Sequence, residues 1–136
     1  MIDRHKARTL AMQALCQFDV QGDGVEQDLP SFLADSGADQ STAAYARILV
    51  AAVRSAQDVI DEQITQHCSG WSIKRMAPVE RNVLRVALAE MQQARVPLKV
   101  IINEAIEISR EFGAAESAGF VNGVLDAIAG NRPKGT

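Results

Sequence analysis

The most constraining feature of this sequence is a pair of amphipathic segments between residues 96 and 130, joined by a corner that contains Gly113. Apolar residues recur in each segment at steps of three and four, so each set lies on one face of an α-helix. The first set is Leu98, Ile101, Ala105, Ile108 and Phe112, and the second is Val121, Val124, Leu125 and Ile128. The pattern predicts a helical hairpin whose apolar faces join a common core.

The rest of the chain shows helical periodicity and no strand pattern. Asp3 suits an N-cap, and Pro78 suits the first turn of a helix. The other expected helical segments span about 3–22, 29–34, 41–68, 73–76 and 78–94. The inward residues expected in the long segment 41–68 are Tyr45, Leu49, Ala52, Ala56, Val59 and Ile60. We predict an all-α, compact bundle of about six to seven helices.

A length of 136 residues fits one domain. At this size folding buries roughly two-thirds of the unfolded surface, enough for a core without a metal or a disulfide. A weak boundary near Gly70–Pro78 divides the chain into helical subdomains of about 1–70 and 71–136. We expect residues 1–136 to form one folding unit that holds no cofactor and no metal.

Cys16 and Cys68 are far apart and form no CxxC pair, so both are expected to be free thiols. His5 and His67 fit no zinc spacing with them, and nothing supplies a nucleophile with an orienting group. We therefore expect no enzyme activity. No segment approaches the roughly 20 apolar residues of a membrane span, and no secretion signal is present, which predicts a cytoplasmic protein.

The formal net charge is −3, but its distribution is uneven. Residues 1–10 carry net +2 and residues 71–99 net +4, whereas residues 11–70 carry net −7 and residues 100–136 net −2. A polyanion would be attracted to the two positive segments and repelled by the acidic one. Nucleic-acid binding is therefore compatible with an acidic protein, provided that the cations are exposed.

The first helix contains the clearest basic cluster. Arg4 and Arg8 are four residues apart and are expected on one face, away from the apolar stripe, with Lys6 to one side. Three cations in this arrangement suit contacts with successive phosphates. The alternative is a solvated helix start, which the helix dipole slightly disfavours.

Several motifs in this order make the chain resemble the NusB family of bacterial transcription antitermination factors. They are the start 4–8 with 14–18, the run Val83-Leu84-Arg85 followed by Glu90, KVIINEAI at 99–106 and FVNGVLD at 120–126. The resemblance covers nearly the whole chain. It implies an all-helical protein that binds the boxA element of nascent ribosomal RNA, usually as a heterodimer with NusE, a small-subunit ribosomal protein, within the RNA polymerase antitermination complex.

The resemblance also implies where RNA binds. It places the basic opening at the RNA, with His5 and Lys6 standing where further arginines are common, so affinity is expected to be lower or slightly pH-dependent. It places Glu116 and Phe120 near the RNA as well. The Phe120 ring then either stacks on an unpaired base or flanks the core stripe.

Other residues have open interpretations. Arg81 and Arg85 share a face and, with Lys99, either extend the RNA track or contact the acidic half of the same protein. Asn103, Glu104 and Asn122 are expected to be structural.

Three alternative functions are compatible with the sequence. One is a homodimer that covers its own RNA face, and another is a helical adaptor that binds only proteins. The third is the targeting module of ribosomal RNA cytosine methyltransferases, which the absence of a glycine-rich cofactor turn disfavours.

Overall fold

The computed structural model describes residues 1–68 and 71–130, and all regular secondary structure in this part of the chain is helical. The prediction of an all-α bundle is confirmed. The helices are α1 (Arg4–Gln21), η1 (Asp23–Gln27), α2 (Leu29–Asp35), α3 (Gln40–Ser55), α4 (Gln57–Gln66), η2 (Ile73–Arg75), α5 (Pro78–Gln93), α6 (Leu98–Phe112) and α7 (Ser117–Gly130).

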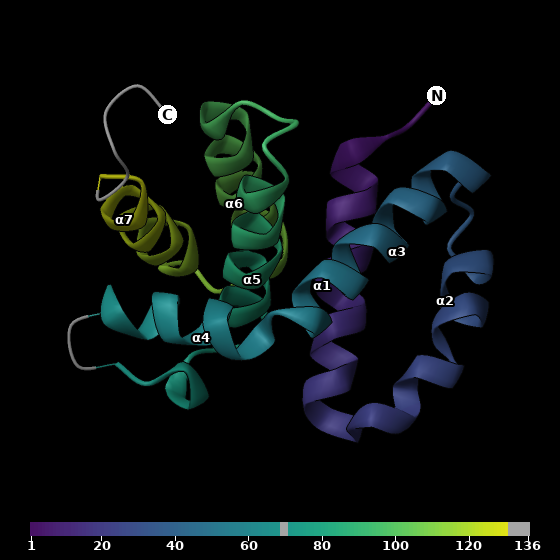
Figure 1. Ribbon diagram of the computed structural model, residues 1–136, viewed down its shortest axis with the longest axis horizontal. Helices are drawn as coiled ribbons and strands as arrows, with labels where there is room; N and C mark the ends of the chain where they lie inside the picture. Colours follow the sequence, from purple (N-terminus) through teal and green to yellow (C-terminus); the bar gives the residue numbers. More distant parts are fainter. Residues whose placement is uncertain (69–70, 131–136) are drawn as a thin grey trace.

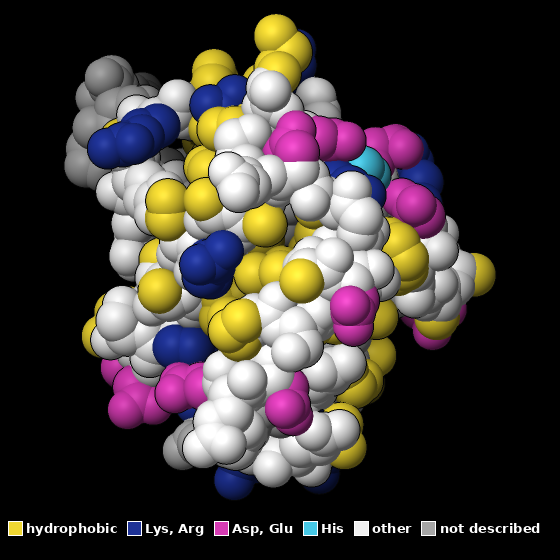
Figure 2. Space-filling view, turned by 90° about the vertical axis from the view of Figure 1, so that its right-hand side faces the viewer, with side chains coloured by type: hydrophobic (Ala, Val, Ile, Leu, Met, Phe, Trp, Pro, Cys, Tyr) yellow, Lys and Arg dark blue, Asp and Glu magenta, His cyan; other side chains and the backbone are white. Residues whose placement is uncertain are grey.

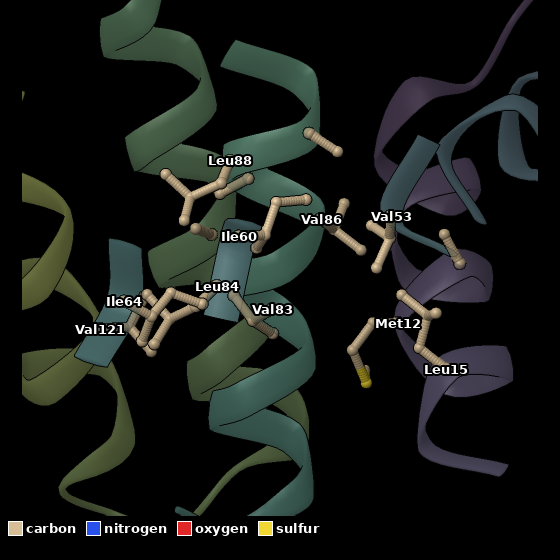
Figure 3. Packing of buried hydrophobic residues seen from close by; sticks show 14 of the residues in the cluster. Met12, Leu15, Val53, Ile60, Ile64, Val83, Leu84, Val86, Leu88 and Val121 are labelled. Atoms are coloured by element: carbon tan, nitrogen blue, oxygen red, sulfur yellow. The ribbon is translucent and has the colours of Figure 1, made fainter. Parts of the chain in front are cut away.

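The helices form two groups that meet at α5. In Figure 1, α1 and α3 cross on the right with α2 outside them, while α4, α6 and α7 lie on the other side of α5. The helix α5 contacts α1, α3, α4, α6 and α7. Figure 3 shows the result, with Val83, Leu84, Val86 and Leu88 of α5 facing apolar side chains from both sides.

Burial on all sides explains the sequence of α5. Every residue from Asn82 to Met91 is buried, so the helix needs apolar side chains around its whole circumference. Three of these buried residues are nevertheless polar or charged, namely Asn82, Arg85 and Glu90. Buried groups of this kind require hydrogen-bond partners, and the neighbouring helices supply them.

The prediction of one helix from Ser41 to about Cys68 is wrong. The chain leaves the helical conformation at Ala56, where φ is −126° and ψ is 21°, and α4 then starts at Gln57. The break lets α4 turn away from α3 and pack Ile60 and Ile64 against α5 and α7. The same turn leaves Val59, an expected core residue, 62% exposed.

The helical hairpin at the end of the chain is confirmed as α6 and α7, which pack against each other and against α5. Its corner is crowded at Gly113, where an added Cβ would lie 2.7 Å from the carbonyl oxygen of Ser109 and 2.8 Å from the side chain of Ser117. One residue of the expected core face, Phe112, is 38% exposed because it ends the helix beside this corner.

The described residues contain one large apolar cluster and one small one. The large cluster joins side chains from α1, α3, α4, α5, α6 and α7, and the small one joins α1, α2 and α3. Apolar contacts therefore cross the boundary at 70–78, while the division into subdomains remains a prediction. Within the same residues, no helix has the length and apolar character needed to cross a membrane.

Candidate nucleic-acid interface

The first turn of α1 is fixed by its cap. The carboxylate of Asp3 accepts a hydrogen bond from the backbone N–H of Lys6 at 3.0 Å, which satisfies an otherwise unpaired donor at the helix start. The backbone N–H of Asp3 donates to Oγ1 of Thr42 in α3 at 2.9 Å. This turn presents Arg4, which is exposed, and Lys6, which is half-buried.

Arg4 lies on an aromatic ring. Its guanidinium carbon is 5.5 Å from the centroid of the Tyr45 ring in α3, a cation–π distance. Among the described residues, no carboxylate pairs with Arg4. The charge of Arg4 is therefore available to an external anion, and its role as a phosphate contact stays a prediction.

The position of Arg8 differs from the exposed position that the sequence analysis expected. Its side chain is buried, and it donates from Nε and Nη2 to the two oxygens of Glu90 at 2.8 and 2.9 Å. A third bond runs from Nη1 to Glu104 at 3.0 Å. Burial opposes the charge, but the hydrogen bonds and attraction of Glu90 raise the pKa of Arg8 above its ordinary value. Arg8 is a buried charge with two carboxylate partners and is not placed to bind a phosphate.

The prediction that Arg8 shares an exposed face with Arg4 is wrong, because the buried face of α1 is wider than its apolar stripe. Ala7, Ala11 and Met12 are buried on either side of Arg8, so Arg8 does not share the exposed face of Arg4. The sequence did contain a signal, because Glu90 falls in the apolar run of α5 and a buried carboxylate needs a cation.

His5 belongs to the same network. Its Nδ1 lies 2.9 Å from Glu104 and its Nε2 lies 3.3 Å from Glu111, both in α6. The hydrogen bond with Glu104 outweighs the effect of burial and, with Glu111, raises the pKa of His5 above its ordinary value. Glu104 thus joins His5 and Arg8 to α6, which agrees with the structural role expected for it.

The side chain of Arg85 is also buried and paired with carboxylates of the same protein. It donates from Nε and Nη2 to both oxygens of Asp61 in α4 at 2.8 and 2.9 Å, and from Nη1 to Asp19 in α1 at 3.1 Å. Arg81 donates from Nε to the same Asp19 at 2.9 Å, and its side chain is 15% exposed. Of the two interpretations open from the sequence, the geometry favours contact with the acidic half of the protein. Arg85 is not available as an extension of an RNA track.

The second candidate region is a pocket of roughly 460 Å³ beside the corner between α6 and α7. It brings Glu116 and Phe120 together with residues around η2 and the start of α5. The lining residues are Trp71, Arg75, Met76, Ala77, Glu80, Ala114, Glu116 and Phe120. Two aromatic rings, one cation and two carboxylates therefore share a single hollow.

The pocket contains both exposed and anchored side chains. Trp71 is 54% exposed, whereas Phe120 is partly buried and packs against the main core cluster. Glu80 accepts a hydrogen bond from the hydroxyl of Ser117 at 2.7 Å, which ties α5 to the first turn of α7. The sequence analysis did not identify Trp71 as a candidate. A tryptophan that is followed closely by Lys74 and Arg75 is nevertheless a recognisable signal for a surface on which bases stack.

The two regions lie at opposite ends of α1. The 18 residues of α1 span about 27 Å. Arg4 lies at its start, whereas Asp19 in its last turn contacts Arg81, the neighbour of the pocket residue Glu80. Figure 1 agrees, with the N-terminus at the upper right and the turn η2, which follows the grey trace after α4, at the lower left. Lys99 is exposed at the start of α6 and lines a different groove, between α6 and α7.

Figure 2 shows how charge is distributed on one face of the molecule. Lysine and arginine side chains stand as separate patches, and acidic side chains lie near several of them. The histidine on this face lies among acidic and basic side chains. The cations on this face do not form one continuous basic strip.

The described residues contain no metal-binding cluster, and their two cysteines are free. No group of three histidine, cysteine, aspartate or glutamate side chains in 1–68 and 71–130 is placed to hold a metal ion. Cys16 and Cys68 are free thiols, and burial raises the pKa of both. A raised pKa disfavours the reactive thiolate.

These features define a class of protein: a helical bundle with an exposed cationic helix start and an aromatic surface pocket. A sequence profile of the NusB family matches residues 5–130. The transcription antitermination protein NusB of Anaeromyxobacter dehalogenans is 40% identical over 131 residues, which cover 96% of this chain and 92% of that protein. The chain belongs to the NusB family.

Solved structures give the same result. The NusB structure of T. maritima superposes with a TM-score of 0.88 at 36% identity, covering 98% of this chain and 96% of that one. A crystal structure of the antitermination factors NusB and NusE in complex with dsRNA contains a chain with a TM-score of 0.85 at 26% identity, covering 95% of this chain and 97% of that one.

Proposed function

We propose that the protein is a non-enzymatic, cytoplasmic transcription antitermination factor that binds a boxA-like single-stranded segment of nascent ribosomal RNA together with NusE. Membership of the NusB family supports the antitermination role. The similar chain found with NusE and dsRNA supports both partners. Binding to RNA and to NusE at once would tether the transcript to the polymerase complex, because linked weak sites raise effective concentration.

The observation that carries the proposal is the aromatic pocket. Trp71 and Phe120 present ring surface at one hollow, and base–aromatic stacking contributes about 1–3 kcal/mol per base. Arg75 in the same pocket can neutralise a phosphate next to a stacked base. A duplex keeps its bases stacked on each other, so a pocket of this kind favours unpaired nucleotides.

The helix start supplies the second contact. Arg4 is exposed and Lys6 is half-buried, and both charges lie at one end of α1. We assign phosphate contacts to these two residues and none to Arg8 or Arg85, which have carboxylate partners within the protein. Lys99 is exposed and remains a proposed extension of the contact surface.

A salt titration tests the phosphate contacts. Binding to a boxA RNA is measured over a range of salt concentrations, with and without NusE, against a scrambled strand and a duplex of the same sequence. Replacing Arg4 and Lys6 by Ala should lower the salt slope by about 0.7 for each phosphate that the variant no longer neutralises. Arg47→Ala removes an exposed arginine from α3 and is the matched control, with an unchanged slope expected.

Substitutions in the pocket test the stacking. Trp71→Ala and Phe120→Ala should each weaken binding by about 1–3 kcal/mol, with a small effect on the salt slope. Phe120→Leu separates the two roles of this residue, because leucine retains apolar packing against the core and lacks the aromatic face. Full affinity in Phe120→Leu together with full affinity in Trp71→Ala would rule out the pocket as the base-binding site.

A further inference from the structure

Tyr45 contacts an exposed side chain, Arg4, and a buried one, Glu90. The face of its ring lies under the exposed guanidinium of Arg4, 5.5 Å from the centroid. Its hydroxyl donates a hydrogen bond of 2.5 Å to Oε2 of Glu90 in the core. The residue therefore connects an exposed cation of α1 with a buried carboxylate of α5.

The buried end of this connection is held by several bonds. Glu90 is 1% exposed and receives two hydrogen bonds from Arg8 in addition to the one from Tyr45. It belongs to α5, whose residues from Asn82 to Met91 are all buried. A buried charge with three donors on a packed helix has little freedom to move, so the hydroxyl of Tyr45 has a fixed acceptor.

At the exposed end, a side-chain hydrogen bond with Arg4 acts on the Tyr45 hydroxyl, and no carboxylate among the described residues pairs with Arg4. A guanidinium is planar, so it can stack on a ring through its face while the N–H groups at its edge remain free to donate to a phosphate. A free arginine side chain loses rotamer entropy when it binds a ligand. A side chain that already rests on a fixed ring loses less.

We propose that Tyr45 is a positioning residue for RNA binding: the buried Arg8–Glu90 pair fixes its hydroxyl, and its ring holds the Arg4 guanidinium with the N–H edge turned to the RNA phosphates. The inference rests on the proposed function, because it explains how one of its contacts is prepared. It also assigns an indirect role in RNA binding to Arg8, whose own side chain is buried.

A double-mutant cycle between Arg4→Ala and Tyr45→Leu tests the proposal. RNA affinity is measured for the full chain, the two single variants and the double variant, with boxA RNA as the probe. Tyr45→Leu should weaken binding about two- to five-fold when Arg4 is present, the size of an exposed cation–π contact. In the Arg4→Ala background the same change should have no effect. The salt slope of Tyr45→Leu should match that of the wild type, because Arg4 still reaches its phosphate.

Two further variants separate positioning from folding. Tyr45→Phe retains the ring and removes the bond to Glu90, so it should weaken binding less than Tyr45→Leu. Arg4→Lys retains the charge and lacks the planar group, so it should bind RNA more weakly than the wild type. Adding Tyr45→Leu to Arg4→Lys should then weaken binding less than it does in the presence of Arg4, because a lysine ammonium contacts the ring without the planar stacking. Thermal unfolding of every variant shows whether it is folded at the assay temperature.

Equal losses of affinity from Tyr45→Leu in both Arg4 backgrounds would overturn the positioning role while leaving the contact by Arg4 intact. An Arg4→Ala variant with wild-type affinity and salt slope would instead refute the contact itself, and with it this part of the proposed function. Neither result would change the conclusion about the pocket, which the substitutions at Trp71 and Phe120 test separately.

Discussion

At the scale of single residues, the structure separates cations by their partners. Arg4 is exposed on an aromatic ring, whereas Arg8 is buried against Glu90 and Glu104. The two residues have the same side chain and lie one helical turn apart. Their roles differ because only Arg8 faces α5 and α6, so spacing along the helix is not enough to assign a phosphate contact.

Removal of Arg8 should mainly affect stability. Arg8→Ala leaves the buried carboxylate of Glu90 without its cation, and the expected cost is about 3–5 kcal/mol in the free energy of unfolding. The double substitution Arg8→Met with Glu90→Leu removes both charges and should recover much of that stability. Urea unfolding measures both values. A double variant as unstable as Arg8→Ala would mean that packing, rather than the unpaired charge, accounts for the effect.

His5 should make stability depend on pH. Its pKa in the folded protein is raised above the unfolded value of 6.5 by Glu104 and Glu111. The contribution of His5 is therefore fully present below pH 6.5 and is lost as the pH rises through the folded pKa. His5→Gln should remove this pH dependence. The measurement is the free energy of unfolding of both proteins against pH, and parallel curves above pH 6.5 would contradict the prediction.

At the scale of helices, the sequence predicted most segments and missed one break. Pro78 starts α5, as expected, and η2 occupies the predicted single turn at 73–76. No Gly or Pro stands at Ala56, so local sequence gives no sign that α3 ends there. The break depends on the packing of Ile60 and Ile64 against α5 and α7, and contacts between distant segments are not visible in local periodicity.

The corner between α6 and α7 should tolerate no side chain at Gly113. An added Cβ would lie 2.7 Å from the Ser109 carbonyl oxygen and 2.8 Å from Ser117, so one of these must move. We expect Gly113→Ala to lower the free energy of unfolding by about 1–3 kcal/mol, the usual cost of overpacking.

Gly123 is the matched control for that substitution. It lies in α7, where an added Cβ meets nothing within 4 Å. Gly123→Ala should therefore stabilise the helix by about 0.5–1 kcal/mol. Urea unfolding measures the change in the free energy of unfolding for each variant. If Gly113→Ala and Gly123→Ala changed it by the same amount in the same direction, the crowding at Gly113 would not explain the result.

At the scale of the whole molecule, the helical bundle places two candidate contact regions apart, one at each end of α1. The basic start indicated the first region, and the resemblance to the NusB family implied the second through Glu116 and Phe120, but neither could show the distance between them. That distance depends on how α1 packs against α5, through pairs such as Arg8 with Glu90 and Arg81 with Asp19, which are 82 and 62 residues apart. Pairings over such separations are determined by the tertiary fold.

The separation predicts a dependence on RNA length. The start of α1 and the pocket lie at opposite ends of a helix of about 27 Å, so a very short oligonucleotide can occupy only one of them. With a complete boxA strand, Arg4→Ala and Trp71→Ala should each weaken binding, and their effects should add because the two sites are far apart.

With a fragment of about three nucleotides, only one of these substitutions should matter, and affinity should be far lower because the linked second site is not engaged. A series of strands of increasing length, titrated against the wild type and both variants, identifies the length at which the second substitution begins to weaken binding. If both substitutions weakened binding of the shortest strand equally, the RNA would have to contact a single compact site, and the assignment of Arg4 and Trp71 to separate ends of one track would be wrong.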